Sequence, residues 1–518
     1  MTDRREKWIS CLALAGLLGF LAVFAVLNFR YLPVFCDGDV YTDMTLAREM
    51  WRQKTLFPAN WIFGNQYYVI ATPVPAALFY GLTGSMTRAM ALATTLMGLL
   101  LLLSFDWMLR PFLPRRSQRL CALLAFTAAP MGSVLLLEPE GQLFFVLASY
   151  YACYLITLFA VFGDYVRALE SPAAVRPAAL LTALALSFAC GMQSLRQTAV
   201  MILPLLALEL LALLARLLRR EALLPPERRR ALRRVLGYTA ANLLGLLLMR
   251  LLRIPQQSIY EAPEGGLAGR LHPVWAALRG ISGLDAALFG RAPLFFVPLF
   301  LAGLLCLLAA AVLVLRRLHR PGALERLWLL CLIGLGGSLL AGLVLPLRMR
   351  EIYLFLWYPL LALSAALLLS RWEKGRFALS LLLAALCLGN LYFSYGSSLR
   401  YAAEKDVSAQ QAFVQDAREA GIRCVYGDWF SLPSYAVWAD DAFRCGFWDE
   451  AVFDTVNYLN LLDIYGEEEN AAGLYFFTEW FEPSFLEVAE KKGATVELFG
   501  VYDRCRAYRS DRPLMRVP

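Results

Sequence analysis

The sequence predicts an α-helical polytopic membrane protein with a small C-terminal α/β domain, and three observations carry this prediction. Of its 518 residues, 59% are hydrophobic and only 17% are charged, whereas soluble chains have about 45–50% apolar and about 25% charged residues. Leucine-rich segments recur at about the 20 residues that a spanning helix needs. Near residue 399 the net charge changes sign, and the last part of the chain is acidic.

Eleven segments are apolar over the length of a membrane span. They are Ile9–Asn28, Ala89–Met108, Leu120–Leu137, Leu143–Phe162, Ala178–Met192, Thr198–Leu214, Val235–Leu252, Phe295–Leu315, Leu327–Leu345, Ile352–Leu369 and Phe377–Tyr395. Tyr67–Leu82 is apolar too, but it is short and contains Pro73 and Pro75. We therefore expect it to be an interfacial or re-entrant helix.

The charge distribution predicts an orientation in the membrane. Residues 399–518 contain 12 basic and 21 acidic residues, a net charge of −9, which leaves +17 on residues 1–398. Because loops rich in Arg and Lys stay in the cytoplasm, we expect a multi-pass protein of the cell membrane with a cytoplasmic N-terminus and an extracytoplasmic C-terminal domain. The excess of arginine thus marks a membrane face and does not imply a nucleic-acid partner.

Two domains follow from these patterns. Residues 1–398 are expected to form the transmembrane domain, with a large outer loop at 31–88. In residues 399–518, short apolar strands alternate with helical stretches, which is typical of a small α/β domain. The strands are Cys424–Tyr426, Gly473–Phe477 and Thr495–Phe499, and the helices include Ser408–Ala420 and Pro483–Lys492. Its tryptophans (Trp429, Trp438, Trp448 and Trp480) suit either a core or carbohydrate stacking.

An acidic pair, Asp37 and Asp39, directly follows the first span and precedes a predicted helix, Met44–Gln53. A carboxylate here can take a proton from an acceptor hydroxyl as a general base. An Asp-x-Asp pair can instead hold a divalent cation such as Mg²⁺ or Mn²⁺. The alternative is a solvated turn in which Asp43 or Thr42 caps the helix.

Other charged residues stand at the predicted outer edge of the membrane. Glu138 and Glu140 occupy a short turn, where they either end helices in water or face the acidic pair and position acceptor or metal. Arg196, Arg348 and Arg350 lie on the side where arginine is disfavoured. They suit lipid headgroups or the bidentate binding of a phosphate leaving group.

The first outer loop resembles a known family. Asp39 stands shortly before Ala47-Arg48-Glu49-Met50, and the proline-containing segment follows. This order resembles the GT-C superfamily of integral-membrane glycosyltransferases, in particular the protein-mannosyltransferase and aminoarabinose-transferase-like branch. There an Asp-Glu pair after the first span precedes Tyr-x-x-x-Ala-Arg-Glu-Met. In this chain Val40 replaces the Glu and Asp43 the Tyr, and Asp37 can supply the second acid.

The resemblance implies transfer of a hexosyl or pentosyl group from a polyprenyl-phosphate sugar to a glycan, lipid or protein acceptor on the outer face of the bilayer. It implies Asp39 or Asp37 as the base, and Arg196 with Arg348 or Arg350 as phosphate ligands. Two other classes compete, a membrane transporter or flippase and a non-catalytic surface-polysaccharide assembly protein. Transporters usually contain repeats and helices broken at the midplane, and the sequence shows no repeat.

Overall fold

The computed structural model describes residues 2–129, 147–170, 177–257, 266–289, 292–345, 349–373, 375–449, 454–455, 459–465 and 473–515. Among these residues, nine helices are long and apolar enough to cross a membrane. They contain α1 (Thr2–Tyr31), α4 (Met86–Leu109), α7 (Ala152–Glu170), α9 (Leu203–Leu218), α10 (Pro226–Leu252), α13 (Pro293–Arg316), α14 (Ala323–Val344), α15 (Trp357–Arg371) and α16 (Arg376–Glu404). The predicted polytopic helical fold is confirmed.

Two further predicted spans correspond to shorter helices. Ala178–Met192 falls on α8 (Pro177–Gln193), and Leu120–Leu137 begins on α5 (Arg116–Ala128) and continues beyond the described residues. Every predicted span therefore overlaps a helix, while the number that crosses the bilayer stays a prediction.

The loop after α1, residues 31–88, is built from short elements. It contains η1 (Leu32–Phe35), α2 (Gly38–Gln53), β1 (Trp61–Ile62) and α3 (Pro73–Thr83). With 11 residues, α3 is about half as long as a spanning helix, and it packs against α2 and α4. We call residues 31–88 the first loop.

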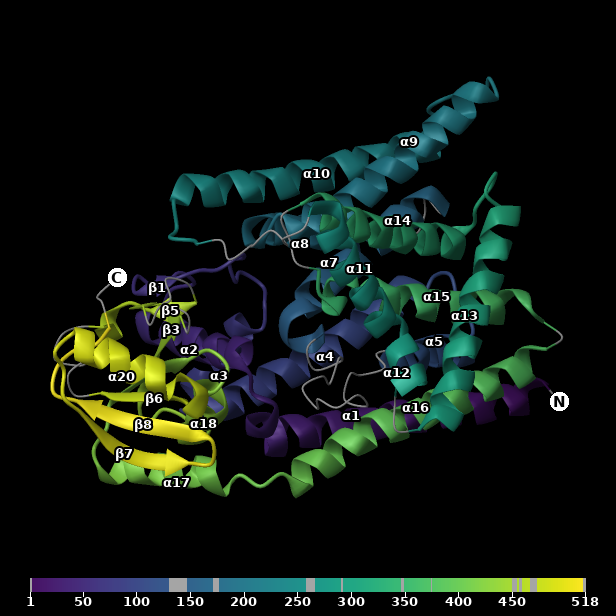
Figure 1. The fold of residues 1–518 in the computed structure, drawn as a ribbon. Helices are drawn as coiled ribbons and strands as arrows, with labels where there is room; N and C mark the ends of the chain where they lie inside the picture. The colour runs from purple at the N-terminus through teal and green to yellow at the C-terminus, as the bar shows by residue number, and fades with distance from the viewer. Residues whose placement is uncertain are drawn as a thin grey trace.

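The chain after α16 forms a six-stranded mixed sheet in the order β4-β3-β2-β6-β8-β7. Its elements are α17 (Ser408–Glu419), β2 (Cys424–Asp428), α18 (Leu432–Ala436), β3 (Arg444–Asp449), β4 (Asp454–Thr455), β6 (Leu474–Thr478), α20 (Glu482–Lys491), β7 (Val496–Tyr502) and β8 (Cys505–Ser510). β2 pairs in parallel with β3 and β6, and β8 is antiparallel to β6 and β7. Figure 1 shows this sheet at one end of the helical bundle, away from the N-terminus.

The tryptophans of this sheet region have different environments. Trp448 is 1% exposed and stacks on Tyr475 with ring centroids 5.9 Å apart, so it belongs to the core. Trp480 is 69% exposed. Trp448 therefore fits the core interpretation, while carbohydrate stacking stays a prediction for the exposed Trp480.

The first loop and the C-terminal sheet region are joined directly. β1 pairs with β5 (Asn460–Leu461), and Arg48 of α2 donates to the Asp441 carboxylate at 2.8 Å. The same carboxylate accepts from Arg52 at 2.9 Å and from the Tyr80 hydroxyl at 2.7 Å. Because the Arg48 side chain is only 1% exposed, its charge depends on these partners rather than on water.

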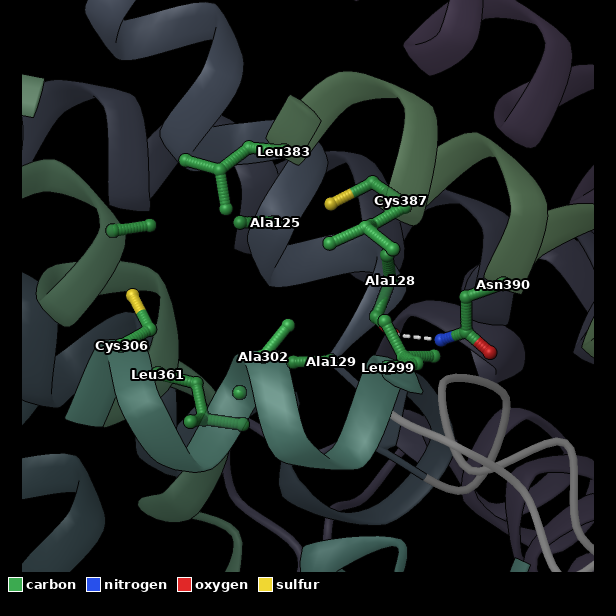
Figure 2. A pocket seen from close by; sticks show the side chains of 13 residues that line it. Ala125, Ala128, Ala129, Leu299, Ala302, Cys306, Leu361, Leu383, Cys387 and Asn390 are labelled. Carbon is green, nitrogen blue, oxygen red and sulfur yellow. Dashed lines mark hydrogen bonds between the residues drawn. The ribbon is translucent and has the colours of Figure 1, made fainter. Parts of the chain in front are cut away.

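Inside the bundle, a cavity of about 90 Å³ lies among α5, α13, α15 and α16. Figure 2 shows small and apolar side chains around it, with Asn390 at one end. The Asn390 amide donates to the Ala128 carbonyl at the end of α5, and the Ser394 hydroxyl donates to Asn390 at 2.8 Å. Since an unpaired carbonyl is costly within a bilayer, Asn390 stabilises this helix end.

The Asp441 contact predicts a difference between two variants. Replacing Asp441 with Ala leaves the buried Arg48 charge with Glu49 as its neighbour, and breaking such a pair costs about 3 kcal/mol. Glu487→Ala is the matched control, since its 63%-exposed carboxylate pairs with Lys491 within α20 and an exposed surface pair contributes little to stability. Hydrogen exchange of the α2 amides measures both effects. Equal protection of α2 in the two variants would contradict the assignment.

Candidate functional site

Asp37 begins α2 by capping its first turn. Its backbone is extended (φ −102°, ψ −176°) and its side chain accepts the Val40 N–H at 2.8 Å. The Tyr150 hydroxyl donates to the same carboxylate oxygen at 3.3 Å. The helix therefore starts at Gly38 and not at Met44, and the alternative of a cap at Asp43 or Thr42 is wrong. An extended Asp before the helix satisfies the orphan N–H groups better than a residue already inside it.

The two faces of α2 contact different parts of the protein. On one face, Trp429 lies so close to Gly38 that an added Cβ would be 2.2 Å from its Nε1 atom, and the Tyr41 hydroxyl donates to the Cys445 thiol at 3.2 Å. Asp39 and Asp43 are one turn apart and point away from this face, because residues four apart share one side of a helix. The two carboxylates are thus turned from the sheet toward the bundle.

The surroundings of these carboxylates favour the protonated form. Burial raises the pKa of Asp39 to about 6, the negative charge of Asp37 adds to this effect, and Arg350 opposes it. The protein packed around Asp37 also raises its pKa, although the residue is exposed at its surface, against the hydrogen bonds from Val40 and Tyr150. Asp43 is 2% exposed. Burial and the charge of Asp39 hold the pKa of Asp43 well above its usual range, although Tyr68 donates to it.

Two of the predicted arginines, Arg196 and Arg350, come from the bundle, toward which Asp39 is directed. Burial lowers the pKa of Arg350. The negative charges of Asp39 and Asp37 and the neighbouring tyrosines raise it by a larger amount, so the net shift of this pKa is upward. The Arg196 guanidinium lies 4.8 Å from the ring centroid of Tyr353, 5.2 Å from Tyr151 and 5.8 Å from Tyr154. Such cation–π contacts help to fix the position of the guanidinium.

Tyr151 connects these groups, since it interacts electrostatically with Arg196, Arg350 and Asp39. Of the predicted site residues, the structure brings together Asp37, Asp39, Arg196 and Arg350 from the first loop, the segment after α8 and the segment before α15. Glu138, Glu140 and Arg348 lie outside the described residues, so their predicted places remain untested.

Several residues of the site were missed by the sequence interpretation. They are the tyrosines at positions 68, 150, 151 and 353, and Asp43 as a buried acid rather than a cap. Tyr68 and Tyr353 stand near the ends of apolar segments. Tyr150 and Tyr151 instead interrupt the predicted span Leu143–Phe162. Their signal is a tyrosine within an apolar segment, where the ring can be buried and the hydroxyl can reach a polar partner.

Asp37 and Asp39 are the described side chains that were predicted to hold a divalent cation. No group of three or more His, Cys, Asp or Glu side chains in the described parts of the chain is placed to hold a metal ion. Mg²⁺ is commonly bound by one or two carboxylates together with substrate phosphate and water. Asp37 and Asp39 could supply the one or two carboxylate ligands of such a site.

This arrangement can perform two chemical tasks. A carboxyl with a pKa of about 6 is mostly ionised at neutral pH and is basic enough to accept a proton there. Fixed guanidinium groups can stabilise negative charge that develops nearby. The site is therefore suited to deprotonating one group while an anion leaves on the opposite side.

The charges around Asp39 predict opposite effects of two substitutions. Arg350→Gln removes a charge that lowers the pKa of Asp39, so that pKa rises above about 6. Asp37→Asn removes a charge that raises it, so the pKa of Asp39 falls. Difference infrared titration of each protein against its Asp39→Asn form measures the carboxyl directly. Shifts in the same direction for both substitutions would contradict this electrostatic assignment.

No protein-family model and no curated protein sequence matches the chain. Its fold is similar to that of ArnT from Cupriavidus metallidurans, a GT-C aminoarabinose transferase. The TM-score is 0.60 for the apo structure and 0.59 for the structure bound to undecaprenyl phosphate, each at 13% identity and covering 98% of both chains. The chain therefore has a GT-C-like membrane fold, as the resemblance of its first loop predicted.

Proposed function

We propose that the protein is a membrane glycosyltransferase that moves a sugar from a polyprenyl-phosphate donor to an acceptor hydroxyl. The observation that carries this proposal is Asp39, a half-buried carboxyl whose pKa is raised to about 6 by burial, with Arg350 beside it. The donor class is supported by the undecaprenyl phosphate bound to ArnT, which shares this fold.

In the proposed reaction Asp39 is the general base. The acceptor oxygen forms a bond to the anomeric carbon while its proton moves to the Asp39 carboxylate. Asp37 is the less suitable base, since one of its oxygens already receives two hydrogen bonds. Its role is to cap α2 and to keep Asp39 basic through its negative charge.

Arg350 and Arg196 are proposed to hold the donor phosphate. The bond between the anomeric carbon and the phosphate oxygen breaks, and its electron pair stays on the phosphate. A guanidinium stabilises the resulting charge through paired N–H donors. Arg348, two positions before Arg350, is proposed as a further phosphate ligand, and Glu138 or Glu140 is proposed to position the acceptor.

The placement in the membrane completes the proposal. The arginine-rich loops favour a cytoplasmic N-terminus, which puts the acidic pair and the sheet region on the outer face. Residues 399–518 then form an extracytoplasmic domain on the transmembrane domain 1–398. The acceptor is proposed to be a glycan, lipid or protein at that face, and the sugar a hexose or pentose.

Asp39→Asn is expected to lower the rate of transfer by about 10²–10⁴-fold, because the acceptor hydroxyl loses its base. The assay uses proteoliposomes, a panel of polyprenyl-phosphate hexoses and pentoses, and envelope lipids and glycans as acceptors. Glu487→Gln, which alters an exposed carboxylate paired only within α20 in the described contacts, is the control and should keep the parental rate.

The outcomes of this assay separate the alternatives. Full activity of Asp39→Asn with an inactive Asp37→Asn would move the base to Asp37, and full activity of both would reject the catalytic pair. The same assay in EDTA tests the divalent cation. Activity lost in EDTA and restored by Mn²⁺ or Mg²⁺ would assign the pair a cation, whereas unchanged activity assigns it the base role alone.

Arg196→Gln and Arg350→Gln are each expected to weaken binding of undecaprenyl phosphate and to slow transfer by about 10²–10³-fold, since the leaving phosphate loses a fixed charge. Arg509→Gln is the matched control. Its guanidinium also lies over an aromatic ring, 4.9 Å from the Phe499 centroid, but in the sheet. Native mass spectrometry of the lipid complex measures binding, and an equal loss in all three variants would argue against a phosphate site.

A further inference from the structure

Two neighbouring strands of the C-terminal sheet end beside exposed aromatic side chains. β2 and β6 are adjacent and parallel, so their carboxyl ends meet at the same edge of the sheet. Phe430 follows β2 and is 77% exposed, and Trp480 follows β6 and is 69% exposed. Single exposed hydrophobic residues are normal on protein surfaces. Here, however, two large exposed rings follow two adjacent strands at the same edge of the sheet.

The same edge also carries an aliphatic side chain and an arginine. β7 runs parallel to β6, because both are antiparallel to β8. Val501, near the carboxyl end of β7, is 52% exposed. The Glu479 N–H donates to the Arg504 carbonyl at 2.7 Å, which places the exposed Arg504 beside the Trp480 segment. We call Phe430, Trp480, Val501 and Arg504 the aromatic edge.

The aromatic edge faces the end of the first membrane helix. Trp429, the neighbour of Phe430, packs on Gly38 at the start of α2, and α18 packs against η1, which directly follows α1. In Figure 1 the turn between β7 and β8 likewise points toward the helical bundle. The edge therefore lies at the level where the chain leaves its first predicted span.

We propose that the aromatic edge rests on the lipid surface of the bilayer and anchors the C-terminal sheet there. Aromatic rings are favoured at the boundary between hydrocarbon and headgroups, and arginine beside them can contact lipid phosphate. The alternative is that these rings contact a substrate at the acidic pair. It is weaker, because Trp429 meets Gly38 on the face of α2 that is turned away from Asp39. This anchor is independent of the proposed transfer reaction.

Site-directed spin labelling tests the anchor in the full-length protein. Phe430→Cys and Trp480→Cys are each labelled with a nitroxide in a Cys11→Ser background, because Cys11 is the one exposed native thiol among the described residues. Lys491→Cys is the matched control, at the far end of α20, where the parent side chain is 70% exposed. The proteins are reconstituted in phosphatidylethanolamine–phosphatidylglycerol vesicles, and collisions with oxygen and with a water-soluble nickel chelate are compared.

The labels at 430 and 480 are expected to collide more with oxygen than with nickel, and the label at 491 to do the reverse. Water-like collisions at all three positions would overturn the proposal, and so would low collision with both reagents, which indicates contact with protein or glycan. Native Trp480 gives a second measurement without a label. Quenching by brominated lipids should decrease in Trp480→Phe, and unchanged quenching would contradict the anchor.

Discussion

The buried charge of Arg48 is the constraint on which the arrangement of the first loop depends. Its side chain is 1% exposed and its partners are Glu49 in the next position and Asp441, 393 positions later. A charge removed from water is tolerated only when it is paired. The first loop can therefore hold α2 in this position only while the C-terminal sheet is docked on it, and a distant part of the chain fixes the orientation of the acidic pair.

This docking gives α2 two distinct environments. The sheet covers the face that carries Gly38 and Tyr41, which leaves Asp39 directed toward the bundle. The bundle in turn supplies tyrosines and the positive groups Arg196 and Arg350. Neither half of the protein holds the whole site, since the acids come from the loop and the cations from segments between later helices. The proposed chemistry arises where the two halves meet.

Local patterns predicted the elements but not their long-range partners. Runs of leucine located the membrane helices, and alternating apolar segments located β2, β6 and β7. The start of α2 was missed, because capping depends on the extended backbone of Asp37. Arg48 was recognised only as part of a motif, since nothing near it indicates Asp441. Strands β3 and β8 carry charged and small residues, Arg444 and Arg509 among them, so their sequences lack a clear apolar alternation.

The central claim is that Asp39, made more basic by its buried position, accepts a proton in sugar transfer. The most direct test is the pH dependence of kcat/KM for transfer in proteoliposomes, measured at low donor concentration so that it reports the free protein. Because the ionised carboxylate is the active form, and burial raises the pKa of Asp39 to about 6, the rate should be constant above that pH and fall about tenfold per pH unit below it. A rate that stays constant down to the ordinary range of an aspartate, near pH 4, would contradict the account.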